Sequence, residues 1–260
     1  MPDSITGFPR RVARRLTRRL QKARGIDDRG IDERGIDDRG IDDRGIDERG
    51  IDDRGIDDRG IDDIDTLHEF WRQPEPEQNV PRTYVSWTGR SEALLKLISD
   101  LPPETRILEV GCNVGRNLAY LVDHGYPNVE GIEISPHAVE LLRQTYPQLV
   151  DSNIHLGSAE EVLPGLADDS FDLVFTMAVI EHIHPSSTAV FDHMVRVGKS
   201  ILSIEPPGRT SHRQYPHDVP EIFQSRGLRL VSSTPMSTFP ETANDGGLSI
   251  FSAYRFERTG

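Results

Sequence analysis

Residues 66–260 predict an α/β domain built on a doubly wound, mostly parallel sheet of seven strands, and three observations support this prediction. Short apolar strands alternate with amphipathic helices along this stretch. The connections between them are short, as in the strand–helix–strand units of a parallel sheet. The last two strands have no helix between them, so we expect them to pair antiparallel at one edge of the sheet.

Local signals justify the individual elements in chain order. Ser91 is expected to cap the first helix and Pro102 to end it. Pro136 falls in the first turn of a later helix, and Gly125 and Gly227 follow the ends of two others. The expected strands are residues 106–110, 128–134, 153–157, 171–179, 199–204, 228–233 and 248–256. The expected helices between them are residues 116–124, 136–146, 187–197 and 217–226.

Residues 1–65 do not follow this pattern and form two segments, residues 1–24 and 25–65. The first is basic, and its apolar side chains recur every four residues, which predicts a short amphipathic helix. Binding to an anionic surface and a solvated tail both stay open for it. The second holds eight copies of Gly-Ile-Asp-Asp/Glu-Arg, the last ending in Ile64 in place of Arg. A five-residue period gathers the Ile side chains on one face of neither a helix nor a strand, so we expect disorder.

Composition and charge exclude several classes of protein. The 260 residues include one cysteine, Cys112, which excludes a disulfide framework and a cysteine-rich zinc site. The formal net charge of −13 lies mostly after residue 64, which argues against broad binding of nucleic acid or anionic membranes by the body. No stretch reaches the roughly 18 apolar residues of a membrane helix, and no secretory signal is found. We therefore expect a cytoplasmic protein without a transmembrane segment.

A glycine-containing turn follows the first strand of the domain and opens the next helix, at residues 109–117. The dinucleotide fingerprint would need glycine where Asn113 and Arg116 stand, so binding of a pyrophosphate is disfavoured. Two acidic residues remain, Glu109 at the end of the first strand and Glu133 at the end of the second. One carboxylate suits a ribose diol, and the other attracts a cation. An adenosine that carries a positive group and no phosphates, such as S-adenosylmethionine, matches this pair.

With these motifs, residues 91–256 resemble the class I S-adenosylmethionine-dependent methyltransferases of the type 11 branch, which share a Rossmann-like fold. Residues 107–115 are similar to the first motif of that family, and residues 131–135 to the motif that follows it. Residues 157–161 and 169–174 are similar to the stretch that leads into the fourth strand. The resemblance implies contacts with the cofactor by Glu109, Gly111, Cys112, Asn113, Gly115, Glu133, Ile134, Ser158, Ala159 and Met177.

The candidate catalytic residue for methyl transfer follows the end of the fourth strand. Methyl transfer to oxygen benefits from a base with a pKa near neutral. His182 is therefore the candidate catalytic residue, although packing of the following loop is an alternative role. Glu181 and His182 resemble the Glu-x-x-Glu-His signature of metal-assisted family members, but Ala178 replaces the first Glu. We therefore expect no metal site.

Two further segments are candidates for contact with the acceptor. A polar cluster follows the fifth strand, and it is either an acceptor-recognition loop or an ordinary exposed loop. Its candidate residues are Arg209, His212, Arg213, Tyr215 and His217. Residues 70–87 contain Trp71, Tyr84 and Trp87, and they form a lid over the cofactor or pack against the sheet.

The function that the resemblance implies is methyl transfer from S-adenosylmethionine to a small molecule, a sugar or a lipid head group. Two alternatives stay open: a nucleic-acid or protein methyltransferase guided by the basic segment, and an inactive adaptor of the same fold. The acidic charge of the body weighs against a nucleic-acid partner.

Overall fold

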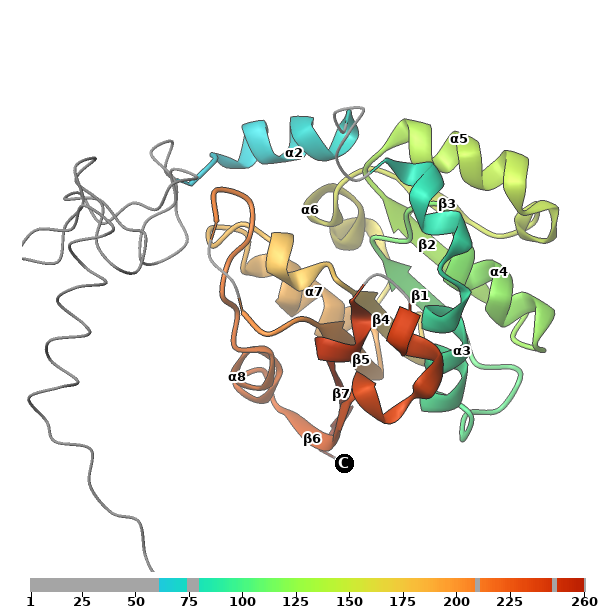
Figure 1. Ribbon diagram of the computed structural model, residues 1–260. Helices are drawn as coiled ribbons and strands as arrows, with labels where there is room; N and C mark the ends of the chain where they lie inside the picture. Colours follow the sequence, from blue (N-terminus) through green and yellow to red (C-terminus); the bar gives the residue numbers. More distant parts are fainter. Residues whose placement is uncertain (1–60, 74–79, 209–210, 245–246, 260) are drawn as a thin grey trace, which may run out of the picture. The chain divides into compact units, whose positions relative to one another are not determined.

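A mixed sheet of seven strands runs through the described part of the chain, in the order β3-β2-β1-β4-β5-β7-β6 (Figure 1). The computed structural model describes residues 61–73, 80–208, 211–244 and 247–259. The expected basic segment and nearly all of the repeat therefore lie outside the described residues. The strands are β1 (Ile107–Val110), β2 (Val129–Glu133), β3 (Ile154–Leu156), β4 (Leu173–Met177), β5 (Ser200–Glu205), β6 (Leu228–Pro235) and β7 (Ser252–Arg258).

The strand pairing confirms the predicted fold class. β1 lies parallel to β2 and β4, β2 to β3, and β4 to β5. β7 runs antiparallel to both β5 and β6, which makes one edge of the sheet antiparallel, as expected. The carboxyl ends of the parallel strands β1 to β5 consequently lie on the same side of the sheet, at the strand ends. Open α/β folds bind their ligands at this carboxyl end.

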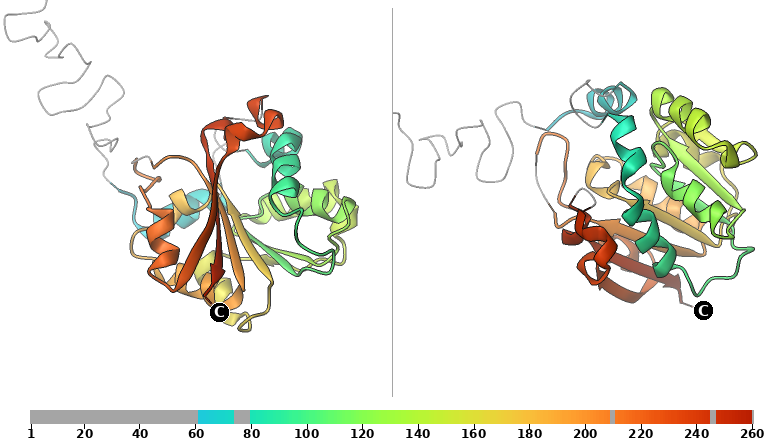
Figure 2. Two further views of the ribbon diagram at one scale, coloured as in Figure 1. Left: turned by 90° about the horizontal axis from the view of Figure 1, so that it is seen from below. Right: turned by 45° about the vertical axis from the view of Figure 1, so that its right-hand side comes forward.

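Helices cover both faces of the sheet (Figure 2). α3, α4 and α5 share one apolar cluster with the sheet, and α6, α7 and α8 share the other. Successive residues of β1 divide between the clusters, Ile107 in the first and Leu108 in the second, because side chains alternate along a strand. The α-helices are α2 (Ile64–Arg72), α3 (Thr88–Leu97), α4 (Arg116–Asp123), α5 (Pro136–Thr145), α6 (Ala159–Val162), α7 (Ala189–Val197) and α8 (Val219–Gln224). The 3₁₀ turns are η1 (Pro81–Ser86), η2 (Pro147–Leu149), η3 (Leu163–Gly165), η4 (Ile180–His182), η5 (Met236–Thr238), η6 (Pro240–Asn244) and η7 (Leu248–Ile250).

Three expected element boundaries are wrong. The first helix, α3, ends at Leu97 and does not continue to Pro102. Ser91 does not cap α3: the helix begins at Thr88, and Ser91 lies buried inside it, where its hydroxyl donates to Asn117 Oδ1 at 2.8 Å. A tertiary hydrogen bond has here overridden the preference of serine for a helix start. The last strand was expected from residue 248, but residues 248–250 form η7, which follows the left-handed Gly247 (φ 78°).

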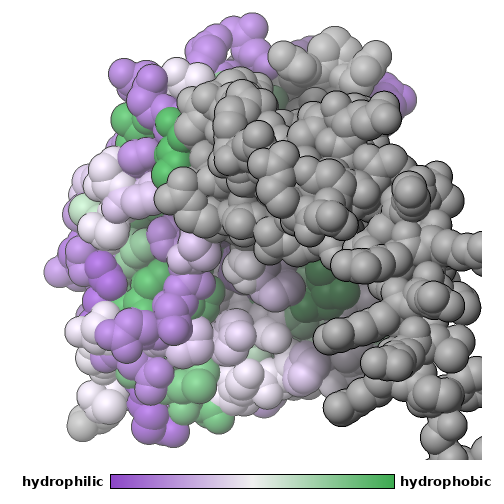
Figure 3. All heavy atoms as spheres, turned by 60° about the vertical axis from the view of Figure 1, so that its left-hand side comes forward, coloured by the Kyte–Doolittle hydropathy of each residue, from purple (hydrophilic) through white to green (hydrophobic). Residues whose placement is uncertain are grey.

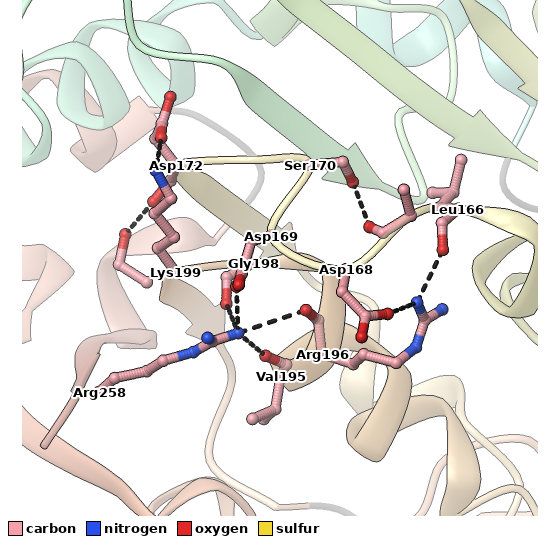
Figure 4. Close-up of polar contacts among 12 residues, drawn as sticks. Leu166, Asp168, Asp169, Ser170, Asp172, Val195, Arg196, Gly198, Lys199 and Arg258 are labelled. Atoms are coloured by element: carbon pink, nitrogen blue, oxygen red, sulfur yellow. Dashed lines mark hydrogen bonds and ion pairs between the residues drawn. The ribbon is translucent and has the colours of Figure 1, made fainter.

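Charged side chains tie the strands together at the opposite, amino edge of the parallel sheet (Figure 4). Asp172, just before β4, accepts from Lys199 Nζ at 2.8 Å and from Arg106 Nη2 at 3.1 Å. Arg196 pairs with Asp168, and Arg258 at the end of β7 donates to backbone carbonyls at the end of α7. The loops that form the site lie at the other end of the parallel strands, the carboxyl end.

The described surface has no extended apolar face in the view of Figure 3, where hydrophilic residues predominate and hydrophobic ones form small groups. The exposed large apolar side chains are Ile61, Val150, Leu156, Val231 and Ile250. In the ranges that the structure describes, no helix combines the length and the hydropathy needed to cross a bilayer.

Candidate active site

A cavity of about 500 Å³ lies at the carboxyl ends of the parallel strands, and its volume falls in the range of small-molecule and cofactor sites. Most of the residues predicted to contact the cofactor line it: Glu109, Gly111, Cys112, Asn113, Glu133, Ile134, Ser158, Ala159 and Met177. His182, the candidate catalytic residue, lines the same cavity. Gly115 is not on its wall: it precedes α4, and a Cβ there would lie 2.5 Å from Leu142 Cδ1. Gly115 therefore makes room for packing against α5.

The turn between β1 and α4 has left-handed backbone at Asn113, where the middle glycine of the family motif is absent. Gly111, Asn113 and Gly115 all have left-handed backbone, with φ of 74°, 48° and 73°. Asparagine tolerates this region better than most residues with a Cβ. Its Oδ1 also accepts the N–H of Val114 at 2.8 Å. Asn113 therefore supports the turn that brings backbone close to the cavity.

Glu133 at the end of β2 holds this turn in place. Its Oε2 accepts the N–H of Asn113 at 2.7 Å, and its Oε1 accepts the N–H of Ser135 at 2.8 Å. Burial raises the pKa of Glu133, and these backbone N–H groups oppose the rise. Each carboxylate oxygen accepts more than one hydrogen bond, so capacity remains for the hydroxyl groups of a ligand.

Glu109 at the end of β1 has one carboxylate oxygen without a hydrogen-bond partner among the described residues. Its Oε1 accepts from Asn117 Nδ2 at 2.7 Å, but its buried Oε2 has no hydrogen-bond partner among the described residues. Burial raises the pKa of Glu109 to about 8, while Asn117 and the Arg116 guanidinium act in the opposite direction. A buried acceptor without a partner is costly. The residues present therefore fit S-adenosylmethionine, whose methionine ammonium is a donor for such an oxygen.

Arg116 and Asn117 follow the glycine turn and were not predicted as site residues. Both line the cavity, and Arg116 donates to the carbonyl of Tyr84 at 3.0 Å, which attaches η1 to α4. A signal was present in the sequence: an arginine at the first position of a helix faces the positive end of the helix dipole. Such a residue needs an acidic neighbour, and Glu109 is close enough to supply it.

His182 is held in one tautomer. Its Nδ1 lies 2.9 Å from the carbonyl oxygen of Arg213. A carbonyl oxygen only accepts, so Nδ1 carries the proton and Nε2 carries the lone pair. Burial lowers the pKa of His182, although the neighbouring Glu181 acts to raise it. The site therefore contains a neutral imidazole whose basic nitrogen, Nε2, lies 3.7 Å from Glu181 Oε1.

The aromatic and polar segments expected near the acceptor contribute unequally. Trp71, Tyr84 and Trp87 all line the cavity, and residues 74–79 of the same segment lie outside the described residues. The polar cluster divides: His212 and Arg213 line the cavity, and Arg209 is not among the described residues. Tyr215 and His217 do not line it: the side chain of Tyr215 is buried, and His217 Nε2 lies 2.8 Å from the carbonyl of Ile183. Within the described residues, no group of three or more His, Cys, Asp or Glu side chains is arranged to hold a metal ion.

Comparison with known sequences finds a family and several relatives. Residues 108–200 match the family described as "Methyltransferase domain". An O-methyltransferase of Pyrenophora dematioidea is 29% identical over 124 residues, which are 46% of this chain and 45% of that protein. The 2-methyl-6-phytyl-1,4-hydroquinone methyltransferase of Synechocystis sp. is 31% identical over 122 residues, 46% of this chain and 37% of that protein. Phosphoethanolamine N-methyltransferase 2 of Caenorhabditis elegans is 25% identical over 131 residues, 48% of this chain and 30% of that protein. The chain spans less than half the length of these curated relatives.

Solved structures share the fold. Magnesium protoporphyrin IX methyltransferase of Synechocystis, solved with bound S-adenosylmethionine, has a TM-score of 0.55 at 16% identity over 77% of this chain and 99% of that chain. A TehB-like methyltransferase of Corynebacterium glutamicum has a TM-score of 0.50 at 19% identity over 66% of this chain and 88% of that chain. The matching family and a neighbour solved with bound S-adenosylmethionine support this molecule as the cofactor. Residues 108–200 thus match a methyltransferase family, and the described sheet has the fold of class I S-adenosylmethionine-dependent methyltransferases.

Proposed function

We propose that this protein transfers a methyl group from S-adenosylmethionine to a hydroxyl group of a small molecule. One observation carries the proposal: two strand-end carboxylates, Glu109 and Glu133, and the neutral imidazole of His182 line a single cavity. Methyl transfer depends mainly on alignment and on the exclusion of water. A hydroxyl acceptor also needs a group that takes its proton, and a neutral imidazole suits that task.

The cofactor assignment follows the chemistry of each side chain. Bound S-adenosylmethionine supplies an electrophilic methyl group on a sulfonium centre. Glu109 accepts from the ammonium of its methionine part, and Glu133 accepts from the ribose hydroxyls. We assign Gly111, Cys112, Asn113 and Met177 to the methionine part, and Ile134, Ser158 and Ala159 to adenine. Gly115 has no contact in this assignment, because it lies off the cavity wall.

His182 is the proposed catalytic residue. Its Nδ1–H donates to the carbonyl of Arg213, so Nε2 is the atom that accepts the hydroxyl proton. Because burial lowers its pKa, the ring is unprotonated at neutral pH and able to accept. The order of events is then alignment of the acceptor oxygen, loss of its proton to Nε2, and displacement at the methyl carbon.

A small-molecule acceptor is supported by relatives and by charge. Two of the matched relatives are named for a hydroquinone and for phosphoethanolamine, both small molecules. The chain carries a net charge of −13, most of it after residue 64, which disfavours a polyanionic acceptor. A nucleic-acid or protein acceptor guided by the basic segment, and an inactive adaptor, are the alternatives that the experiment must separate.

The experiment has two stages. Calorimetric titration of the full chain with S-adenosylmethionine is expected to give saturable heat, and its absence would refute the proposal. Methyl-labelled S-adenosylmethionine is then supplied with a small-molecule extract, total RNA or total protein. Label in the small-molecule fraction alone is expected, whereas label in RNA or protein supports the first alternative and binding without transfer supports the adaptor. His182→Asn should lower turnover about 100-fold or more without loss of cofactor affinity, whereas Glu130→Gln, at a residue off the cavity wall, should change neither.

A further inference from the structure

Arg213 joins two segments that are far apart in the sequence. Its Nε lies 2.8 Å from Asp62 Oδ2, and its guanidinium carbon lies 3.6 Å from the centre of the Phe70 ring. The N–H of Asp62 also donates to the carbonyl of His212 at 3.0 Å. The side chains of Arg213 and Asp62 are only 21% and 14% exposed, so this ion pair is screened less than one at the surface. Asp62 and Phe70 thus clamp Arg213 from two sides.

The clamped residue contacts the candidate base through its backbone. The carbonyl oxygen of Arg213 accepts the Nδ1–H of His182 at 2.9 Å. The next residues hold the loop against η4: Gln214 Nε2 donates to Glu181 Oε2 at 2.6 Å, and the N–H of Tyr215 donates to the carbonyl of Glu181 at 2.8 Å. Two sets of contacts therefore fix the position of the Arg213 carbonyl. The Arg213 side chain is held by Asp62 and Phe70, and the residues that follow Arg213 are hydrogen-bonded to Glu181.

Two acceptors compete for the single ring proton of His182. The Arg213 carbonyl faces Nδ1 at 2.9 Å, whereas Glu181 Oε1 lies 3.7 Å from Nε2. The shorter contact selects the Nδ1–H tautomer, because only the 2.9 Å separation has the length of a hydrogen bond. If the Arg213 carbonyl moved away, the proton would be drawn to Nε2 by the carboxylate. Nε2 would then be unable to accept a proton from a substrate.

We infer that Arg213 is a positioning residue, which keeps His182 in its proton-accepting tautomer because Asp62 and Phe70 clamp the Arg213 side chain. The part played by Nε2 in the reaction rests on the proposed function, but the tautomer does not. α2 thereby contributes to the base as well as to the wall of the cavity: Trp71, next to Phe70, lies against the His182 ring with 4.5 Å between ring centres.

The test reads the tautomer directly. The full chain is labelled with ¹⁵N in its histidine rings, and the His182 signals are assigned by their loss in His182→Asn. In the wild type, Nδ1–H is expected to be the main tautomer. In Arg213→Ala and in Asp62→Asn, the Nε2–H signal is expected to become the major one. Arg229→Ala, which removes a surface arginine paired with Glu257 at the far edge of the sheet, is the matched control and should leave the spectrum unchanged.

Kinetics supply the second readout. Arg213→Ala is expected to lower kcat about 10- to 100-fold, the range for a misplaced base, and to leave the KM for S-adenosylmethionine unchanged. Arg213→Lys keeps the charge opposite Asp62 and should recover part of kcat. If Arg213→Ala does not fold, Phe70→Leu, which removes only the ring face, is measured in its place.

An unchanged tautomer in folded Arg213→Ala, or in its replacement Phe70→Leu, together with an unchanged tautomer in Asp62→Asn, would overturn the inference. Failure of the proposed function is recognised separately, because the calorimetric titration of the wild type with S-adenosylmethionine does not depend on the tautomer. A protein that binds no cofactor but changes tautomer in Arg213→Ala would retain the positioning role and lose the proposed reaction.

Discussion

The two carboxylates at neighbouring strand ends differ in how many of their oxygens have hydrogen-bond partners. Glu133 has a backbone N–H donor at each oxygen, whereas one oxygen of Glu109 has no partner among the described residues. The first therefore contributes to the shape of the turn in the absence of ligand, and the second gains a partner only when a donor enters. This difference predicts separate behaviour for the two residues.

Glu109 is expected to lose a proton when the cofactor binds. At pH 7, which lies below its pKa of about 8, the carboxyl is mostly protonated in the free protein, and a cationic ligand favours the ionised form. Calorimetric titrations with S-adenosylmethionine in two buffers of different ionisation enthalpy should therefore show proton release. Glu109→Gln should abolish the release. Glu205→Gln, which changes a second buried carboxyl with a pKa of about 8 that does not line the cavity, should preserve it. Heats independent of the buffer in the wild type would contradict the prediction.

Glu133→Ala is expected to weaken the binding of S-adenosylmethionine by about 1–3 kcal/mol, since hydrogen bonds to a charged acceptor are lost. Glu130→Ala on the same strand is the control, because Glu130 pairs with His155 and does not line the cavity. Calorimetry measures both. Equal affinities of the Glu133→Ala variant and the wild type would remove the ribose assignment.

The candidate site residues that could be predicted from the sequence are those next to a strand end. Glu109, Glu133 and His182 each follow or end a strand, and a strand is visible in the sequence as an apolar run. The clamp on Arg213 was not predicted, because Asp62 lies 151 positions away and no local pattern encodes so distant a pair. The tautomer of His182 could not be predicted either, because it depends on the carbonyl of Arg213, which lies on another loop.

At the scale of elements, the corner after β4 shows how one strand shapes the loop of its neighbour. Ala178 has left-handed backbone (φ 58°), which is strained for a residue with a Cβ. Glu205 at the end of β5 accepts the N–H of Val179 at 3.1 Å and the hydroxyl of Thr176 at 2.8 Å. The strained corner that leads to His182 is thus fixed from the next strand.

Glu205→Gln is expected to change how stability depends on pH. Burial raises the pKa of Glu205 from 4.5 to about 8, so between these values the folded state binds more protons than the unfolded state. The contribution of Glu205 to stability is therefore complete below its unfolded value and falls as the pH rises towards 8. The glutamine variant lacks this fall, and above about pH 8 it should be more stable than the wild type by about 1–3 kcal/mol. Urea unfolding at pH 5 and pH 9 measures the effect, and parallel profiles would contradict it.

Helix boundaries were harder to predict than the parallel or antiparallel direction of the strands. The alternation of strands and helices is a local property, and it predicted the parallel pairing that was found. The start of α3 depends on tertiary contacts instead: Ser91 has the residue type of a cap, but its hydroxyl is used by Asn117 on the next helix. The preference of serine for helix starts does not take account of tertiary hydrogen-bond partners such as Asn117.

At the scale of the whole molecule, the two edges of the parallel strands have opposite roles. Ion pairs close the amino edge, and the carboxyl edge holds the cavity. Arg106 and Lys199 hydrogen-bond to Asp172 and hold the pKa of its carboxyl well below its usual range. This ionised carboxylate consequently stabilises the fold without taking part in the site.

Asp172→Asn is expected to lower the free energy of unfolding at pH 7 by about 1–2 kcal/mol, because the residue is one-third exposed and part of its interaction is screened. The folded pKa is depressed, so this stabilisation is complete above the ordinary value of 3.8 and is lost as the pH falls below it. Urea unfolding at pH 7 and pH 3 should therefore give a smaller difference between wild type and variant at pH 3. Asp168→Asn, at a 73% exposed partner of Arg196, should cost less than about 1 kcal/mol at pH 7.

The last three residues of the final pentapeptide copy, Asp62, Asp63 and Ile64, belong to the folded body. Asp62 of that copy pairs with Arg213, Asp63 caps α2 by accepting the N–H of Thr66, and Ile64 opens the helix where the other copies have arginine. Replication slippage that inserts or deletes whole copies upstream leaves the spacing between these three residues and the catalytic loop unaltered. A change of Asp62 in the terminal copy, by contrast, would remove the ion pair with Arg213.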